Sequence, residues 1–147
     1  MKYSQAKLGR IFVIRLEDGD ILHECIENFA KKKKILAGFL IAVGGADKDS
    51  RLVVGPLKSR ATPVTPMEIV LDDAHEIAGV GTIFPNSKGE AILHMHISCG
   101  RRRKSVTGCV RKGVKIWHVM EIILWELKTQ TAKRLLEKST GFELLTP

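Results

Sequence analysis

The sequence lacks the features that direct a protein to a membrane or out of the cell. Its 147 residues contain no uninterrupted apolar run of about 18 residues, the length that a membrane-spanning helix needs. Residues 1–7 are polar and have no apolar stretch of the kind found in secretory signals. The three cysteines are an odd number, form no CxxC pair and match no disulfide framework. We therefore expect a cytoplasmic protein without a membrane partner.

Short catalytic motifs are also missing. The chain contains no nucleophile elbow, no Walker phosphate loop and no zincin helix motif. Gly44 and Gly45 do not make a phosphate-binding loop, because a turn and a strand, rather than a helix, are expected after them. An enzyme is therefore not the favoured class. A hydrolase or lyase that uses a metal-bound water stays as an alternative.

The composition is that of a soluble globular protein with an excess of basic residues. Hydrophobic residues make up 44% of the chain and charged residues 27%. Because we find no repeat, low-complexity segment or linker, we expect one domain over residues 1–147. The 24 lysines and arginines outnumber the 16 acidic residues, which gives a net charge of +8. This charge would attract nucleic acid phosphates, but it also fits an ordinary solvated surface.

Apolar and β-branched segments predict an α+β fold, with an antiparallel sheet flanked by helices. Strands are expected at residues 10–16, 35–43, 51–54, 67–71, 77–84, 91–98, 106–110 and 114–127. Residues 21–30 place their apolar positions on one helical face, and Asp18 or Asp20 is expected to cap this helix. A second, short helix is expected at residues 131–138.

The strand at residues 114–127 is apolar on both faces, which indicates that both faces are covered. A helix would cover one face and another sheet or a second subunit the other, so the pattern favours oligomerisation. His118 and Met120 are expected to share one face of this strand. Glu121 would need a partner there, because an unpaired buried carboxylate is costly.

Two histidines in one strand are the main candidates for chemistry. His94 and His96 are two residues apart, so their side chains share one face of the strand. If the following turn is centred between Arg102 and Arg103, the antiparallel register places Cys109 opposite His96. Directly opposed Cβ atoms lie about 4.5–5.5 Å apart, close enough for the three side chains to converge. A one-residue slip would instead turn Cys109 to the other face.

Two imidazoles and a thiolate form a ligand set that suits zinc far better than calcium or magnesium. His94, His96 and Cys109 are therefore the candidate metal ligands, with the fourth position left to water or to an unassigned group. In the alternative interpretation the histidines bind no metal and are hydrogen-bonded. If the site is an enzyme centre, Glu121 is the candidate proton acceptor.

Six basic residues around the same hairpin form the candidate nucleic-acid interface. They are Arg101, Arg102, Arg103 and Lys104 at the predicted tip, with Arg111 and Lys112 nearby. Such a cluster would contact phosphates without reading bases, so the expected partner is DNA without sequence preference. A charged turn that only keeps the hairpin soluble is the alternative.

The chain resembles the plant and prokaryote conserved (PPC) domain family from about Gly9 to Leu127. The most specific matches are His94-x-His96-x-Ser98, Gly108-Cys109, Gly113 and Glu121. The resemblance implies an antiparallel sheet flanked by helices, assembly as a homotrimer and a role in DNA binding.

Two features differ from the family pattern. The AT-hook that accompanies the domain in plants, a short Arg-Gly-Arg-Pro element, is missing. Cys109 stands where the family usually has a third histidine, and Thr107 replaces the first of two preceding glycines. Cysteine and histidine both coordinate zinc, so the substitution preserves the chemistry of a metal site.

Overall fold

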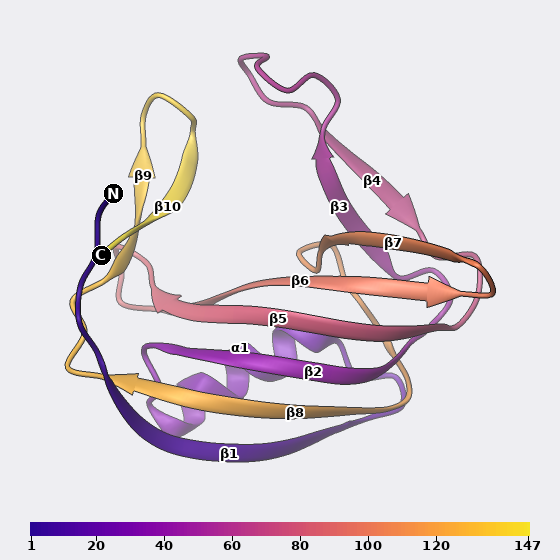
Figure 1. Ribbon diagram of the computed structural model, residues 1–147, viewed down its shortest axis with the longest axis horizontal. Helices are drawn as coiled ribbons and strands as arrows, with labels where there is room; N and C mark the ends of the chain where they lie inside the picture. Colours follow the sequence, from indigo (N-terminus) through magenta and orange to yellow (C-terminus); the bar gives the residue numbers. More distant parts are fainter.

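The computed structural model describes residues 1–147 and is organised around one large antiparallel sheet (Figure 1). Its eight strands lie in the order β1-β8-β2-β5-β6-β7-β3-β4. Their bounds are β1 (Lys7–Glu17), β2 (Gly38–Ala46), β3 (Arg51–Pro56), β4 (Pro66–Val70), β5 (His75–Pro85), β6 (Ala91–Arg101), β7 (Lys104–Cys109) and β8 (Ile116–Lys128). A separate hairpin consists of β9 (Lys133–Glu137) and β10 (Phe142–Thr146), and the helix α1 spans Leu22–Lys33. The expected α+β class and antiparallel sheet are confirmed, with one helix instead of several.

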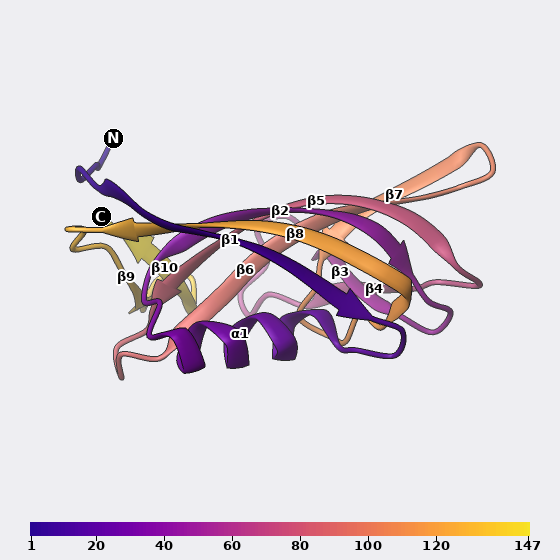
Figure 2. The ribbon, with the colours of Figure 1, turned by 90° about the horizontal axis from the view of Figure 1, so that it is seen from below.

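The helix covers one face of the sheet (Figure 2). Leu22, Ile26 and Ala30, spaced four residues apart, are fully buried, as expected from the apolar stripe. They belong to the main core together with the inward-facing residues of the central strands. The helix is 12 residues long, and the structure contains no helix long and apolar enough to cross a membrane.

The expected aspartate caps of this helix are wrong. Asp18 accepts a hydrogen bond from the backbone N–H of His118 (2.7 Å), and Asp20 accepts one from that of Glu17 (2.9 Å). The first helical N–H, that of Leu22, donates to the carbonyl of Val114 (2.9 Å) instead. Because the β1–α1 turn packs against the start of β8, a backbone carbonyl replaces the side-chain cap.

The other face of the sheet is not covered by the chain. Six large apolar side chains on it are exposed by 38–83%: Ile11, Val13, Phe39, Ile41, Val43 and Val80. Only one face of β8 is therefore covered within one chain, and Glu121 is exposed on the open face without needing a buried partner. His118 also departs from its expected face. A bulge opposite Gly44 and Gly45 leaves it exposed with a φ of 59°.

The predicted C-terminal helix at residues 131–138 is a β-hairpin instead. β9 and β10 pair antiparallel, with Leu135 opposite Leu144. Gly141 closes the turn with a φ of 72° and donates its N–H to the carbonyl of Glu137 (2.8 Å). This left-handed conformation favours glycine and reverses the chain, so the backbone pairs across the turn rather than along a helix. The hairpin packs against β5, where Arg134 reaches Thr82.

Candidate metal centre

The β6–β7 hairpin has the register expected from the sequence. Arg101 pairs with Lys104 at the tip, and His96 lies directly opposite Cys109. The Nε2 atoms of His94 and His96 are 3.2 Å apart, and their rings are tilted by 77°. One ligand atom each from His94, His96 and Cys109 lies within 4.8 Å of the other two. The structure thus brings the three predicted ligands together.

The alternation of β6 explains why these side chains converge. Leu93, Met95 and Ile97 point to the helix-covered face, where each is at most 5% exposed. The intervening His94 and His96 consequently lie on the opposite face. His96 is exposed and His94 is half-buried.

The spacing and the donor types fit a zinc ion. Two nitrogens that each lie about 2.0–2.1 Å from a tetrahedral zinc are roughly 3.3–3.4 Å apart. The separation of 3.2 Å between the two histidine nitrogens is close to this value. The sulfur of Cys109, a residue only 6% exposed, supplies a third and softer donor.

The surroundings of His94 keep its ring neutral. Burial, with the positive charges of Arg134 and Arg111, lowers the pKa of His94 to about 4. A neutral imidazole carries the free lone pair that coordination requires, so at neutral pH no proton must be displaced from this ring.

Next to the candidate ligands is a cleft of about 390 Å³ at the edge of β6. β7 pairs with β6 only as far as His96, which leaves part of the β6 edge without a strand partner. Glu27 of α1 accepts a hydrogen bond from the N–H of Leu93 there (2.9 Å), in place of a strand partner. Helix α1, the segment after β7 and the C-terminal hairpin form the walls, and His94 lines the cleft.

Two residues of this cleft, His23 and Arg134, were not expected from the sequence to lie near His94. His23 lies on α1, and Arg134 lies on β9, in the hairpin that replaces the helix expected at residues 131–138. The turn-forming run Ser139-Thr140-Gly141 was a usable signal for the hairpin that carries Arg134.

Glu121 is too far from His96 to act as a proton acceptor at the same centre. Between their strands, β8 and β6, lie β2 and β5. Three strand spacings of about 4.8 Å separate them by roughly 14 Å.

The six candidate nucleic-acid-binding residues are separated into two groups. Arg102, Arg103 and Lys104 are exposed at the hairpin tip and form no ion pair. Arg101 instead donates to the carbonyl of Ala74 (2.9 Å) and pairs with Asp73.

Lys112 and Arg111 lie at the other end of β7, away from the tip. Lys112 pairs with Glu68 (3.4 Å), and Arg111 lines the cleft beside His94. Of the six residues, Arg102, Arg103 and Lys104 therefore stay together as an exposed basic patch without ion pairs.

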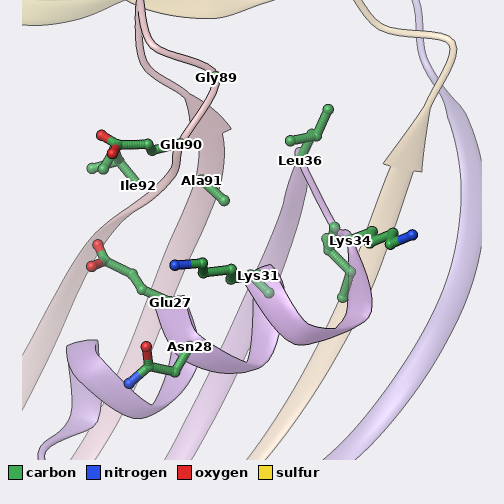
Figure 3. A pocket seen from close by; sticks show the side chains of 11 residues that line it. Glu27, Asn28, Lys31, Lys34, Leu36, Gly89, Glu90, Ala91 and Ile92 are labelled. Carbon is green, nitrogen blue, oxygen red and sulfur yellow. The ribbon is translucent and has the colours of Figure 1, made fainter.

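A larger cleft of about 620 Å³ lies between α1 and the turn before β6 (Figure 3). Lys31, Lys34 and Glu90 line it, and Glu27 belongs to both clefts. No histidine or cysteine is among its lining residues, so it has no ligand set comparable to the candidate metal centre.

Solved structures with the same fold include three informative proteins. A plant- and prokaryote-conserved (PPC) protein of Pyrococcus horikoshii is 25% identical, with a TM-score of 0.85 over 100% of this chain and 98% of that one. A metal-containing protein of Archaeoglobus fulgidus is 20% identical, with a TM-score of 0.86 over 100% of both chains. A candidate DNA-binding protein of Bacteroides thetaiotaomicron is 17% identical, with a TM-score of 0.75 over 97% of both chains.

Sequence comparisons give the family directly. A search of curated proteins finds no significant match. The family model described as the Plants and Prokaryotes Conserved (PCC) domain matches residues 3–128, which is most of the chain. The protein therefore belongs to the Plants and Prokaryotes Conserved domain family, the family that its sequence resembles.

Proposed function

We propose that the protein binds one zinc ion per chain through His94, His96 and Cys109. The observation that carries this proposal is the approach of their ligand atoms to within 4.8 Å of one another on two paired strands. The similarity to a metal-containing protein of Archaeoglobus fulgidus supports it. Three protein ligands leave a fourth position for water or for a bound molecule.

Each residue has a distinct task in this site. His94 and His96 present neighbouring imidazole nitrogens from one strand, and Cys109 presents its sulfur from the next. A bound zinc ion would supply a Lewis acid next to the cleft at the edge of β6.

The three free cysteines of the chain also fit the reducing cytoplasm that we infer for it.

Elemental analysis of the purified protein tests the zinc proposal. We expect about one zinc per chain in the wild type and almost none in H94A/H96A or C109A, because each variant removes ligands. H118N is the matched control. His118 is exposed and has a left-handed φ that asparagine tolerates. Wild-type protein that takes up no added zinc, or a C109A variant that retains it fully, would refute the assignment.

A second candidate function is sequence-independent DNA binding by the hairpin tip. The tip extends beyond the rest of the sheet (Figure 2) and presents Arg102, Arg103 and Lys104 without acidic partners. Exposed cations on a projecting turn can reach the phosphates of a duplex without reading its bases. The candidate DNA-binding protein of Bacteroides thetaiotaomicron shares the fold.

Fluorescence anisotropy of labelled duplex DNA at several salt concentrations tests this function. We expect affinity to fall steeply with salt, and the triple variant R102Q/R103Q/K104Q to reduce the slope of log K against log salt by about 0.9 for each lost phosphate contact. The variant K31Q/K32Q/K33Q removes the same charge from the end of α1 and should change binding much less. Binding that ignores salt, or equal losses in both variants, would exclude the tip as the interface.

We also propose that the chain assembles as a homotrimer. The open, apolar face of the sheet supports this assembly, because an exposed patch of this kind favours association with another copy.

A further inference from the structure

Arg134 is an unusual residue because it is charged, buried and without an acidic partner. It lies on β9 with only 5% of its surface exposed. Its Nη2 donates to the hydroxyl of Thr82 (3.1 Å), but its Nε is buried and has no hydrogen-bond partner. A buried, unpaired guanidinium N–H carries the cost of lost hydration without compensation.

The cleft around Arg134 contains further groups that lack partners. His23 of α1, another lining residue, also has a buried ring nitrogen, Nδ1, without a hydrogen-bond partner. Arg111 contributes a second positive charge, and burial and Arg111 lower the pKa of Arg134. Both arginines act on His94, which also lines the cleft.

The acidic residues of the cleft form no ion pair with either arginine. Glu27 lines it but accepts the N–H of Leu93, and Glu143 lines it and attracts Arg134 only from beyond ion-pair distance. Two cations consequently face a space of about 390 Å³, large enough for a small organic ligand.

We propose that this cleft binds the carboxylate or phosphate group of a small molecule through Arg134 and Arg111. Arginine presents several N–H groups in a planar fork, so it recognises carboxylate and phosphate oxygens in pairs. A bound anion would give the orphan Nε of Arg134 an acceptor and reduce the repulsion between the two arginines. The anion site does not require zinc. Only the placement of the ligand beside a metal ion rests on the function proposed above.

Calorimetric titration with inorganic phosphate and, separately, with acetate tests the proposal. Metal-free protein at low ionic strength and neutral pH is used first, because zinc itself attracts anions. We expect saturable binding of at least one of the two probes, and the tighter one identifies the group that the cleft prefers.

Variants then locate the anion. R134Q should weaken binding about tenfold or more, the usual loss for a charge-assisted hydrogen bond, and R111Q should weaken it severalfold. K133Q is the matched control. It removes the same charge from the neighbouring, exposed position of β9 and should leave affinity within about twofold. If R134Q does not fold, R111Q decides, because Arg111 is exposed.

C109S separates this proposal from the zinc proposal. It should lose zinc but keep its affinity for the anion. The anion site is overturned if neither probe binds saturably to the wild type, or if K133Q loses as much affinity as R134Q. It is also overturned if metal-free protein and C109S bind no anion while zinc-loaded wild type does. The last result would place the anion on the metal and leave the zinc proposal intact.

Discussion

Glu126 shows how nearby cations, Arg10 first and Lys128 (3.8 Å) second, keep a buried carboxylate charged. Its side chain, 8% exposed, fills the bulge of β1 between Leu8 and Ile11, and receives the backbone N–H of Arg10 (3.1 Å). The Arg10 guanidinium also donates to both carboxylate oxygens, at 2.8 and 3.0 Å. These contacts, the Arg10 side chain first, lower the pKa of Glu126 from 4.5 to about 2.

Replacing Arg10 should therefore destabilise the protein in a pH-dependent way. We expect R10M to lower the free energy of unfolding at pH 7, because it removes the three hydrogen bonds that Arg10 donates to the buried Glu126 side chain, through its guanidinium or at its backbone, or weakens them, and leaves Lys128 as the remaining cation, 3.8 Å away. A carboxyl with a lowered pKa in the folded state stabilises the fold above its unfolded pKa and loses this contribution as pH falls. The difference from wild type should thus shrink between about pH 4.5 and pH 2.

Urea unfolding at a series of pH values measures this effect. R15M is the control, since Arg15 and Glu17 form an ion pair in which both side chains are more than 60% exposed. Such pairs contribute about 0–1 kcal/mol. A pH-independent loss in R10M would contradict the account of Glu126.

Glu126 could have been found from the sequence. It lies an even number of residues from Met120, Ile122 and Leu124, which face the core, so the alternation of side chains along β8 alone places it on the inward face. Glu121, the carboxylate that was expected to need a buried partner, lies an odd number of residues from Glu126 and therefore faces the open side of the sheet. His94 and His96 were predictable for the same reason, since their spacing fixes their common face.

At the scale of elements, local signals decided which parts of the fold could be predicted. The β6–β7 hairpin combines alternation with a short polar turn, and its predicted register is correct. The β9–β10 hairpin was missed because Leu135 and Leu136 are adjacent among charged residues, a pattern that one turn of helix also fits. Its strands are held by contacts made across the fold, such as that of Arg134 with Thr82, which no local pattern reveals.

The bulge where β2 meets β8 depends on Gly44. Its φ is 151°, and a Cβ at this position would lie 2.3 Å from the carbonyl oxygen of Val119. G44A should therefore lower the free energy of unfolding by about 2–5 kcal/mol, from backbone strain and overpacking together. The control is G89A, where φ is 80° but no atom lies within 4 Å, so only strain of about 1–2 kcal/mol is expected. Equal losses in urea unfolding would show that close packing at Gly44 is unimportant.

At the scale of the whole molecule, the open face links assembly to the candidate metal centre. Val13, Ile41 and Val80 lie in one row across the sheet, and this row continues to His96 and Cys109. Their exposure on one chain contrasts with the dense packing under α1. A partner that covers this face would also approach the metal ligands.

Light scattering after size-exclusion chromatography measures the predicted assembly. We expect the wild type to have the mass of three 16.3 kDa chains, and I41E to shift toward the monomer because it places a charge at the centre of the apolar face. L36E is the control, since Leu36 is 53% exposed but lines the cleft between α1 and β6 instead. A monomeric wild type, or an I41E variant that stays trimeric, would contradict this use of the face.

X-ray absorption at the zinc edge tests the central claim most directly, because it reports the atoms around the ion. For zinc-loaded wild type the account predicts one sulfur at about 2.3 Å and nitrogen or oxygen ligands at about 2.0–2.1 Å. The C109A variant should lose the sulfur signal. A zinc ion surrounded only by nitrogen and oxygen in the wild type would contradict a site built from His94, His96 and Cys109.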